Sequence, residues 1–67
     1  MLYIKAKRER VGKTQQQIAD EIGVTLDTIS KYENGRNLPG ADKLPALARA
    51  LGCTIDDLYT DDRKEVS

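Results

Sequence analysis

The chain has 67 residues, with 11 basic and 11 acidic side chains, one cysteine and no histidine. Such a length allows one domain with a small core, a lone cysteine excludes an internal disulfide, and a zinc site of about four ligands has no histidine to use. No apolar run approaches the roughly 20 residues of a membrane span and no signal-peptide core is present, so we expect a cytoplasmic protein.

The charges are unevenly distributed along the chain. Residues 1–37 carry seven basic and five acidic side chains, a net charge of +2, whereas residues 38–67 carry four basic and six acidic, a net charge of −2. A neutral total argues against nonspecific binding of nucleic acid by charge alone. The basic half is compatible with an anionic partner, although an ordinary mixed surface explains it equally well.

The first helix is predicted over residues 2–11 and ends before a glycine. Its inner face follows the spacing i, i+4, i+7 and consists of Ile4, Arg8 and Val11, while the lysines at positions 5 and 7 fall elsewhere. A guanidinium that faces a core needs a carboxylate partner, and Glu33 is the candidate. The alternative is that Arg8 is solvated and only its stem is covered.

Residues 14–35, TQQQIADEIGVTLDTISKYENG, contain the signals of two short helices joined by a tight turn. Thr14, with Gln17 three residues later, fits a capping box that begins the first helix, and Gly23 ends it. Thr25 can cap the second helix, which Asn34 and Gly35 stop. Apolar residues at helical spacing supply the inner faces: Ile18, Ala19 and Ile22, then Ile29 and Tyr32 or Glu33. The turn of roughly three or four residues is typical of a helix-turn-helix.

Beyond the motif, the segment RNLPGA predicts a loop, and two further helices follow. An amphipathic pattern that ends at Gly52 predicts the first, with Pro45 in its first turn: Leu44, Leu47, Ala48 and Leu51. Thr54 and Asp57 give a weaker capping signal for the second, which passes through Ile55, Leu58 and Tyr59. We therefore expect an all-α fold, a compact bundle of five short helices over residues 1–59 with the helix-turn-helix at about 15–34, and a polar tail at 60–67.

Together these segments resemble the Cro/C1-type helix-turn-helix family (XRE), the phage-repressor class of bacterial regulators, whose DNA-binding domains are lambda-repressor-like. The resemblance covers about Ile4 to Tyr59 and rests on Arg8, TQQQIADEIGVT, TISKYENG and LPALARALGCTIDDL in this order. It implies sequence-specific binding of double-stranded DNA by a small transcriptional regulator, with a repressor favoured. It also implies an operator that is an inverted repeat, bound by a homodimer with half-sites about 34 Å apart.

The resemblance also assigns roles to individual residues. The second motif helix, at about 25–33, is similar to the recognition helix that lies in the major groove, and its base-reading positions are Thr25, Leu26, Asp27, Thr28 and Lys31. Phosphate contacts are implied for Gln15, at the N-terminus of the first motif helix, and for the loop residues Asn34, Arg36 and Asn37. The family also pairs an arginine and a glutamate at the positions of Arg8 and Glu33, in agreement with the pattern of the first helix.

Several of these roles have a structural alternative. Leu26 could meet a thymine methyl or form the rim of the core, and Asp27 could accept from cytosine N4 or only stabilise the helix N-terminus. Lys31 could contact guanine, a phosphate or solvent, and Gln15 could be only a helix former. The target sequence therefore does not follow from these residues.

A homodimer is predicted through the last two helices, with four candidate contact residues: Leu51, Ile55, Leu58 and Tyr59. The alternative is that the two leucines belong to the core and that the chain is monomeric away from DNA. No enzyme activity, cofactor, metal or small-molecule ligand is expected, because histidine and a glycine-rich phosphate loop are missing. The rival function is a protein-interaction module such as an antitoxin, with DNA binding secondary.

Overall fold

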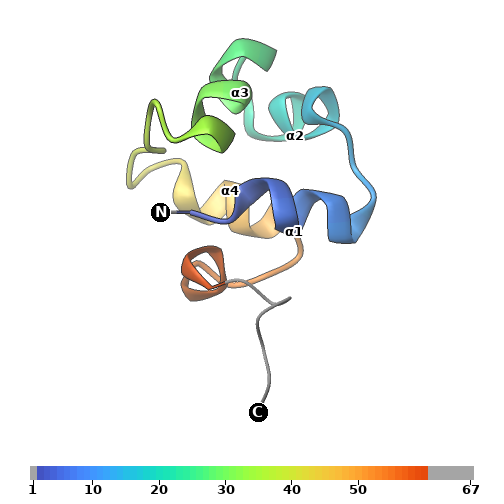
Figure 1. Cartoon of the computed structure of the whole chain (residues 1–67), viewed down its shortest axis with the longest axis vertical. Coiled ribbons are helices and arrows are strands. Elements are labelled where there is room, and N and C mark those ends of the chain that lie inside the picture. Colours follow the sequence, from blue (N-terminus) through green and yellow to red (C-terminus); the bar gives the residue numbers. More distant parts are fainter. Residues whose placement is uncertain (1, 61–67) are drawn as a thin grey trace.

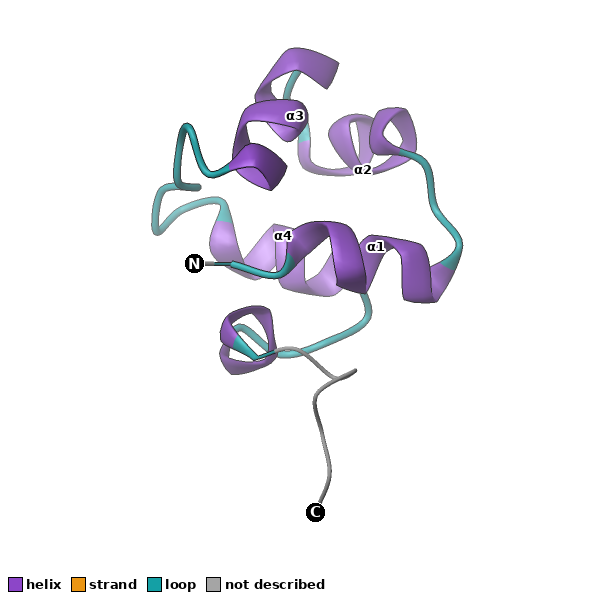
Figure 2. Ribbon diagram, in the orientation of Figure 1, coloured by secondary structure: helices purple, strands orange, loops and turns teal. Residues whose placement is uncertain are grey.

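A computed structural model describes residues 2–60, and over this range the fold is entirely helical (Figures 1 and 2). The elements in chain order are α1 (Ile4–Val11), α2 (Gln15–Ile22), α3 (Leu26–Asn34), α4 (Leu44–Ala50) and the 3₁₀ helix η1 (Asp56–Tyr59). The predicted all-α class is confirmed. Four α-helices and one 3₁₀ helix replace the five helices that the sequence predicted, and the rest of the predicted tail, residues 61–67, lies outside the described residues.

The two motif helices begin and end at the predicted signals. In the capping box of α2, Thr14 Oγ1 accepts from the Gln17 N–H at 3.1 Å, and Gln17 Oε1 accepts from the Thr14 N–H at 2.7 Å. Thr25 Oγ1 accepts from the Thr28 N–H at 3.2 Å and caps α3. Gly23 ends α2 with φ of 75°, a left-handed conformation that glycine adopts without strain.

The last element is a 3₁₀ helix because it is short and its hydrogen bonds span three residues. The expected cap is formed: the Thr54 N–H donates to Asp57 Oδ2 and the Asp57 N–H donates to Thr54 Oγ1, both at 3.1 Å. The Leu58 N–H then donates to the Ile55 carbonyl at 3.0 Å. Elements of four residues commonly take this tighter form.

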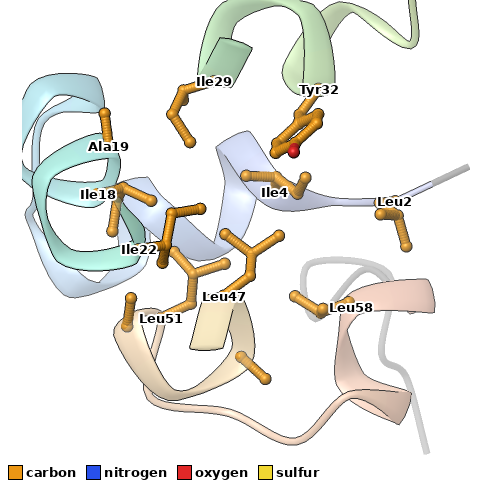
Figure 3. Packing of buried hydrophobic residues seen from close by; sticks show 12 residues of the cluster. Leu2, Ile4, Ile18, Ala19, Ile22, Ile29, Tyr32, Leu47, Leu51 and Leu58 are labelled. Atoms are coloured by element: carbon orange, nitrogen blue, oxygen red, sulfur yellow. The ribbon is translucent and has the colours of Figure 1, made fainter. Parts of the chain in front are cut away.

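One hydrophobic core joins the elements, and helix α2 packs against both α3 and α4 while α1 packs against α3. Figure 3 shows side chains from these helices and from η1 directed toward a common interior. Seven hydrophobic side chains in it have no exposed surface: Ile4, Ile18, Ala19, Ile29, Leu47, Leu51 and Leu58. Helices of two turns are marginal in isolation, so this packing is what holds each of them in place.

The inner face of α1 differs from the prediction. Lys7, which was expected away from the apolar stripe, is only 1% exposed, whereas Val11, which was expected on it, is 38% exposed. The buried face therefore runs through Ile4, Lys7 and Arg8, at i, i+3 and i+4. The aliphatic stem of a lysine can pack like an apolar side chain, but at 1% exposure the ammonium group is buried too and needs partners inside the fold, which a pattern of apolar residues does not predict.

Candidate nucleic-acid interface

The helix-turn-helix places α3 with one face in the core and the other in solvent. The turn between α2 and α3 consists of Gly23, Val24 and Thr25, and it is held by the Val24 N–H, which donates to the Ala19 carbonyl at 3.0 Å. Ile29 and Tyr32 anchor the inner face of α3. The opposite face is turned away from the bundle, at the upper end of the molecule in Figure 1.

The positions predicted to read bases gather at the first turns of α3. Leu26 is 44% exposed and lies on the outer surface, outside the buried core. Asp27 Oδ2 and Lys31 Nζ form an ion pair at 3.1 Å across one turn of the helix. The hydroxyls of Thr25 and Thr28 are hydrogen-bonded to each other at 2.9 Å. This surface thus carries one apolar side chain beside two polar pairs.

The Asp27–Lys31 contact was not predicted, although its signal is present in the sequence. Residues four apart on a helix are neighbours, and an acidic residue preceding a basic one at this spacing is the favourable order. The pair therefore forms within α3 and needs no other element.

The end of α3 and the loop after it supply further polar groups. Asn34 Nδ2 lies 3.5 Å from Ser30 Oγ, and the exposed Arg36 and Asn37 follow Gly35. Among residues 2–60, the Arg36 side chain makes no hydrogen bond or ion pair, so its guanidinium is available to an anion. Leu38, which the sequence did not single out, is 72% exposed in the same loop.

A buried ion pair links α1 to α3 behind this surface. Arg8 Nε donates to Glu33 Oε2 at 2.7 Å and Arg8 Nη2 donates to Glu33 Oε1 at 3.3 Å, with side chains only 13% and 4% exposed. Arg8 Nη1 also donates to the Lys13 carbonyl at 3.0 Å. The hydrogen bond with Glu33 raises the pKa of Arg8 above its ordinary value despite the opposing effect of burial, so the guanidinium stays charged.

Gln15 belongs to the same network, a link that the sequence did not predict. It is the first residue of α2, and its Nε2 donates to Glu33 Oε1 at 3.0 Å. A side-chain amide carries two N–H groups, so one remains for another acceptor. Gln15 is therefore held in a defined orientation beside the unpaired backbone N–H groups of the α2 N-terminus. A residue that served only to form the helix would not need this side-chain hydrogen bond.

The predicted dimer residues divide into two groups. Leu51 and Leu58 have no exposed surface and belong to the core of a single chain, so the prediction that they contact a second copy is wrong. Ile55 and Tyr59 are 37% and 54% exposed. These two residues lie in or beside η1, at the end of the molecule opposite α3 in Figure 1.

Within the described range, no group of three or more histidine, cysteine, aspartate or glutamate side chains is arranged to hold a metal ion. The helices between residues 2 and 60 are also too short and too polar to cross a bilayer.

A helix-turn-helix family model matches residues 4–58, from the start of α1 to η1. The chain belongs to the Cro/C1-type helix-turn-helix family. One family member, the cryptic phage CTXphi transcriptional repressor RstR of Vibrio cholerae, is 42% identical over 64 residues, which are 90% of this chain and 57% of that protein. An uncharacterised HTH-type regulator of Methanothermobacter thermautotrophicus is 39% identical over 57 residues, 84% of this chain and 83% of that protein. For several other curated relatives, the chain spans about half of their length or less.

Solved structures of the family share the arrangement of the helices. The DNA-binding domain of the P22 c2 repressor superposes with a TM-score of 0.86 at 29% identity, covering 97% of this chain and 86% of that one. The P22 c2 repressor in complex with a synthetic operator gives a TM-score of 0.79 at 32% identity, covering 88% of this chain and 89% of that one.

Proposed function

We propose that this chain binds specific sequences of double-stranded DNA and regulates transcription as a repressor. The observation that carries the proposal is α3, whose inner face is fixed in the core while its outer face presents hydrogen-bonding side chains to solvent. Membership of the helix-turn-helix family and the names of the relatives, a phage repressor among them, support it. We place this activity in the cytoplasm, where operator DNA is accessible.

In this proposal the outer face of α3 enters the major groove, which is about 12 Å wide and admits one helix. Five residues then face the base edges: Thr25, Leu26, Asp27, Thr28 and Lys31. The exposed Leu26 can contact a thymine methyl, while the paired polar groups around it exchange their mutual hydrogen bonds for bonds to bases.

Phosphate contacts fix the register of α3 on the duplex. Gln15 offers its remaining amide N–H at the positive N-terminus of α2, and Arg36 offers a guanidinium from the loop after α3. Asn34 and Asn37 lie on either side of Arg36 and complete the phosphate-binding set. Arg8 and Glu33 are positioning residues, because the Glu33 carboxylate orients Gln15.

The operator is expected to be an inverted repeat, bound by a homodimer with half-sites about 34 Å apart. Ile55 and Tyr59 are the residues that we propose for the contact between the two copies. Both are exposed and lie in or beside η1, away from α3, so a second copy can cover them without covering the outer face of α3 (Figure 1).

A protein-interaction module, such as an antitoxin, is the competing function. The outer face of α3 is polar apart from Leu26, which favours DNA over an apolar partner surface. Measuring the affinity for duplex DNA at several salt concentrations separates the two. We expect the logarithm of the binding constant to fall by about 0.9 per phosphate contacted for each tenfold rise in salt. Binding that is undetectable at low salt would reject the proposal.

A further inference from the structure

The two charges on the outer face of α3 are already paired in the protein without DNA. Lys31 Nζ lies 3.1 Å from Asp27 Oδ2, and the two side chains are 44% and 75% exposed. Exposed pairs of this kind contribute little to folding stability. Asp27 also stabilises the N-terminus of α3, whose first turn it occupies. Its exposed carboxylate nevertheless lies on the surface that we propose to face DNA.

We propose that Asp27 and Lys31 act as one reading unit that selects a G·C base pair in the major groove. This inference rests on the proposed function and identifies which base pair the unit reads. Lys31 donates to guanine while Asp27 accepts from the cytosine of the same pair.

The chemistry of the two side chains matches the edge of that base pair. Guanine presents two adjacent acceptors, O6 and N7, and cytosine presents the N4 donor beside them. The lysine ammonium has donors only, and the ionised aspartate has acceptors only. The two head groups are only 3.1 Å apart, and guanine O6 and cytosine N4 are neighbouring groups on the edge of one base pair, so both head groups can meet that edge together.

An A·T pair does not offer the same pattern. Its single donor, adenine N6, lies between two acceptors, adenine N7 and thymine O4. A carboxylate placed on N6 therefore faces the lone pairs of both acceptors. The unit rejects A·T because the Asp27 carboxylate gives up its hydrogen bonds to water on binding and gains no good donor in exchange.

The pairing also limits binding to other sequences. Asp27 neutralises Lys31 across one turn, so the unit as a whole has little attraction for phosphates, in keeping with the zero net charge of the chain. The Thr25 and Thr28 hydroxyls bond to each other and leave the carboxylate to Lys31. Specificity then comes from the unfavourable contact with wrong bases as much as from the favourable contact with the right one.

The test begins with the duplex that the wild-type protein enriches from a random library. Each G·C pair of that duplex is replaced in turn by A·T, and affinities are measured for the wild type, for Asp27→Asn and for Asp56→Asn. The control makes the same change of charge at an exposed position of η1, at the other end of the molecule. Circular dichroism confirms that each variant is folded.

For the wild type, we expect one G·C replacement in the half-site to weaken binding roughly 10- to 100-fold through this unit. In Asp27→Asn the same replacement should weaken binding less than about threefold or strengthen it, because an amide pairs well with adenine N6 and N7. Asp56→Asn should keep the wild-type profile at every position.

A second variant separates base reading from the ion pair itself. Exchanging the two residues, Asp27→Lys with Lys31→Asp, keeps the charges and the i, i+4 pair but reverses the order of donor and acceptor. We expect the preference at that position to be lost or changed. If Asp27→Asn or the exchanged variant retains the wild-type G·C preference, the inference is overturned while the proposed function stands. If the wild type enriches no sequence, the proposed function itself fails, and the inference fails with it.

Discussion

Replacing Glu33 by alanine should destabilise the fold strongly, because it leaves Arg8 as a buried cation. Arg8 is only 13% exposed, and two of its nitrogens donate to the Glu33 carboxylate at 2.7 and 3.3 Å. Removing one partner of a buried pair costs about 3–5 kcal/mol. A chain of 67 residues has a total stability of roughly 3–10 kcal/mol, so about a third of it or more would be lost. At about 4–8 °C per kcal/mol, the melting temperature should fall by at least about 12 °C.

The assay is urea and thermal unfolding followed by circular dichroism. Glu33→Gln is the milder variant, because its amide oxygen still accepts one hydrogen bond. The double variant Arg8→Leu with Glu33→Leu should be more stable than Glu33→Ala, since it leaves no buried charge without a partner.

The loss of unfolding free energy in Glu33→Ala should be constant from about pH 7 to 10. Glu33 raises the pKa of Arg8 further above this range, so the guanidinium is charged in the folded and unfolded states throughout it, and the contribution of the pair is lost only at more alkaline pH. A loss below about 1 kcal/mol would refute the structural role of the pair.

Four further predictions concern single positions. Arg36→Ala should weaken DNA binding for all sequences and reduce, by about 0.9, the slope of the logarithm of the binding constant against the logarithm of the salt concentration. Gln15→Ala should weaken binding without changing this slope, because glutamine releases no counterion. Anisotropy titrations at several salt concentrations measure both effects. Thr25→Ala removes the cap of α3 and should lower the unfolding free energy by about 1 kcal/mol in urea titration, and an unchanged value would show that the cap is not needed. Ile55→Asp should abolish self-association in sedimentation without lowering the melting temperature by more than a few degrees, since Ile55 is already 37% exposed; a dimer that persists would place the contact elsewhere.

The ends of the motif helices could be predicted because their signals are local. A threonine cap with a glutamine three residues later, and a glycine that takes a positive φ, act within one turn of the chain. The pairing of Arg8 with Glu33 was also within reach, because a charged residue at an apolar position requires an opposite charge. Both inferences need only the residue types and their spacing in the sequence, not the packing of the helices.

Other features depend on how the helices pack, and the sequence alone does not give them. The burial of Lys7 depends on which face of α1 the other helices cover, and its charge argues against that position. The hydrogen bond from Gln15 to Glu33 joins residues 18 apart in sequence. The prediction that Leu51 and Leu58 lie in a dimer surface fails because a helical pattern marks an apolar face without showing whether the same chain already covers it.

The proposal that α3 reads DNA sequence is tested most directly by selecting bound duplexes from a random library at two salt concentrations, with Lys31→Ala in parallel. We expect the wild type to enrich an inverted repeat whose half-sites are about one helical turn apart, and we expect Lys31→Ala to change the preferred base at one position in each half-site. Enrichment of no sequence, with weak binding at both salt concentrations, would contradict DNA recognition and would favour a protein partner for the same fold.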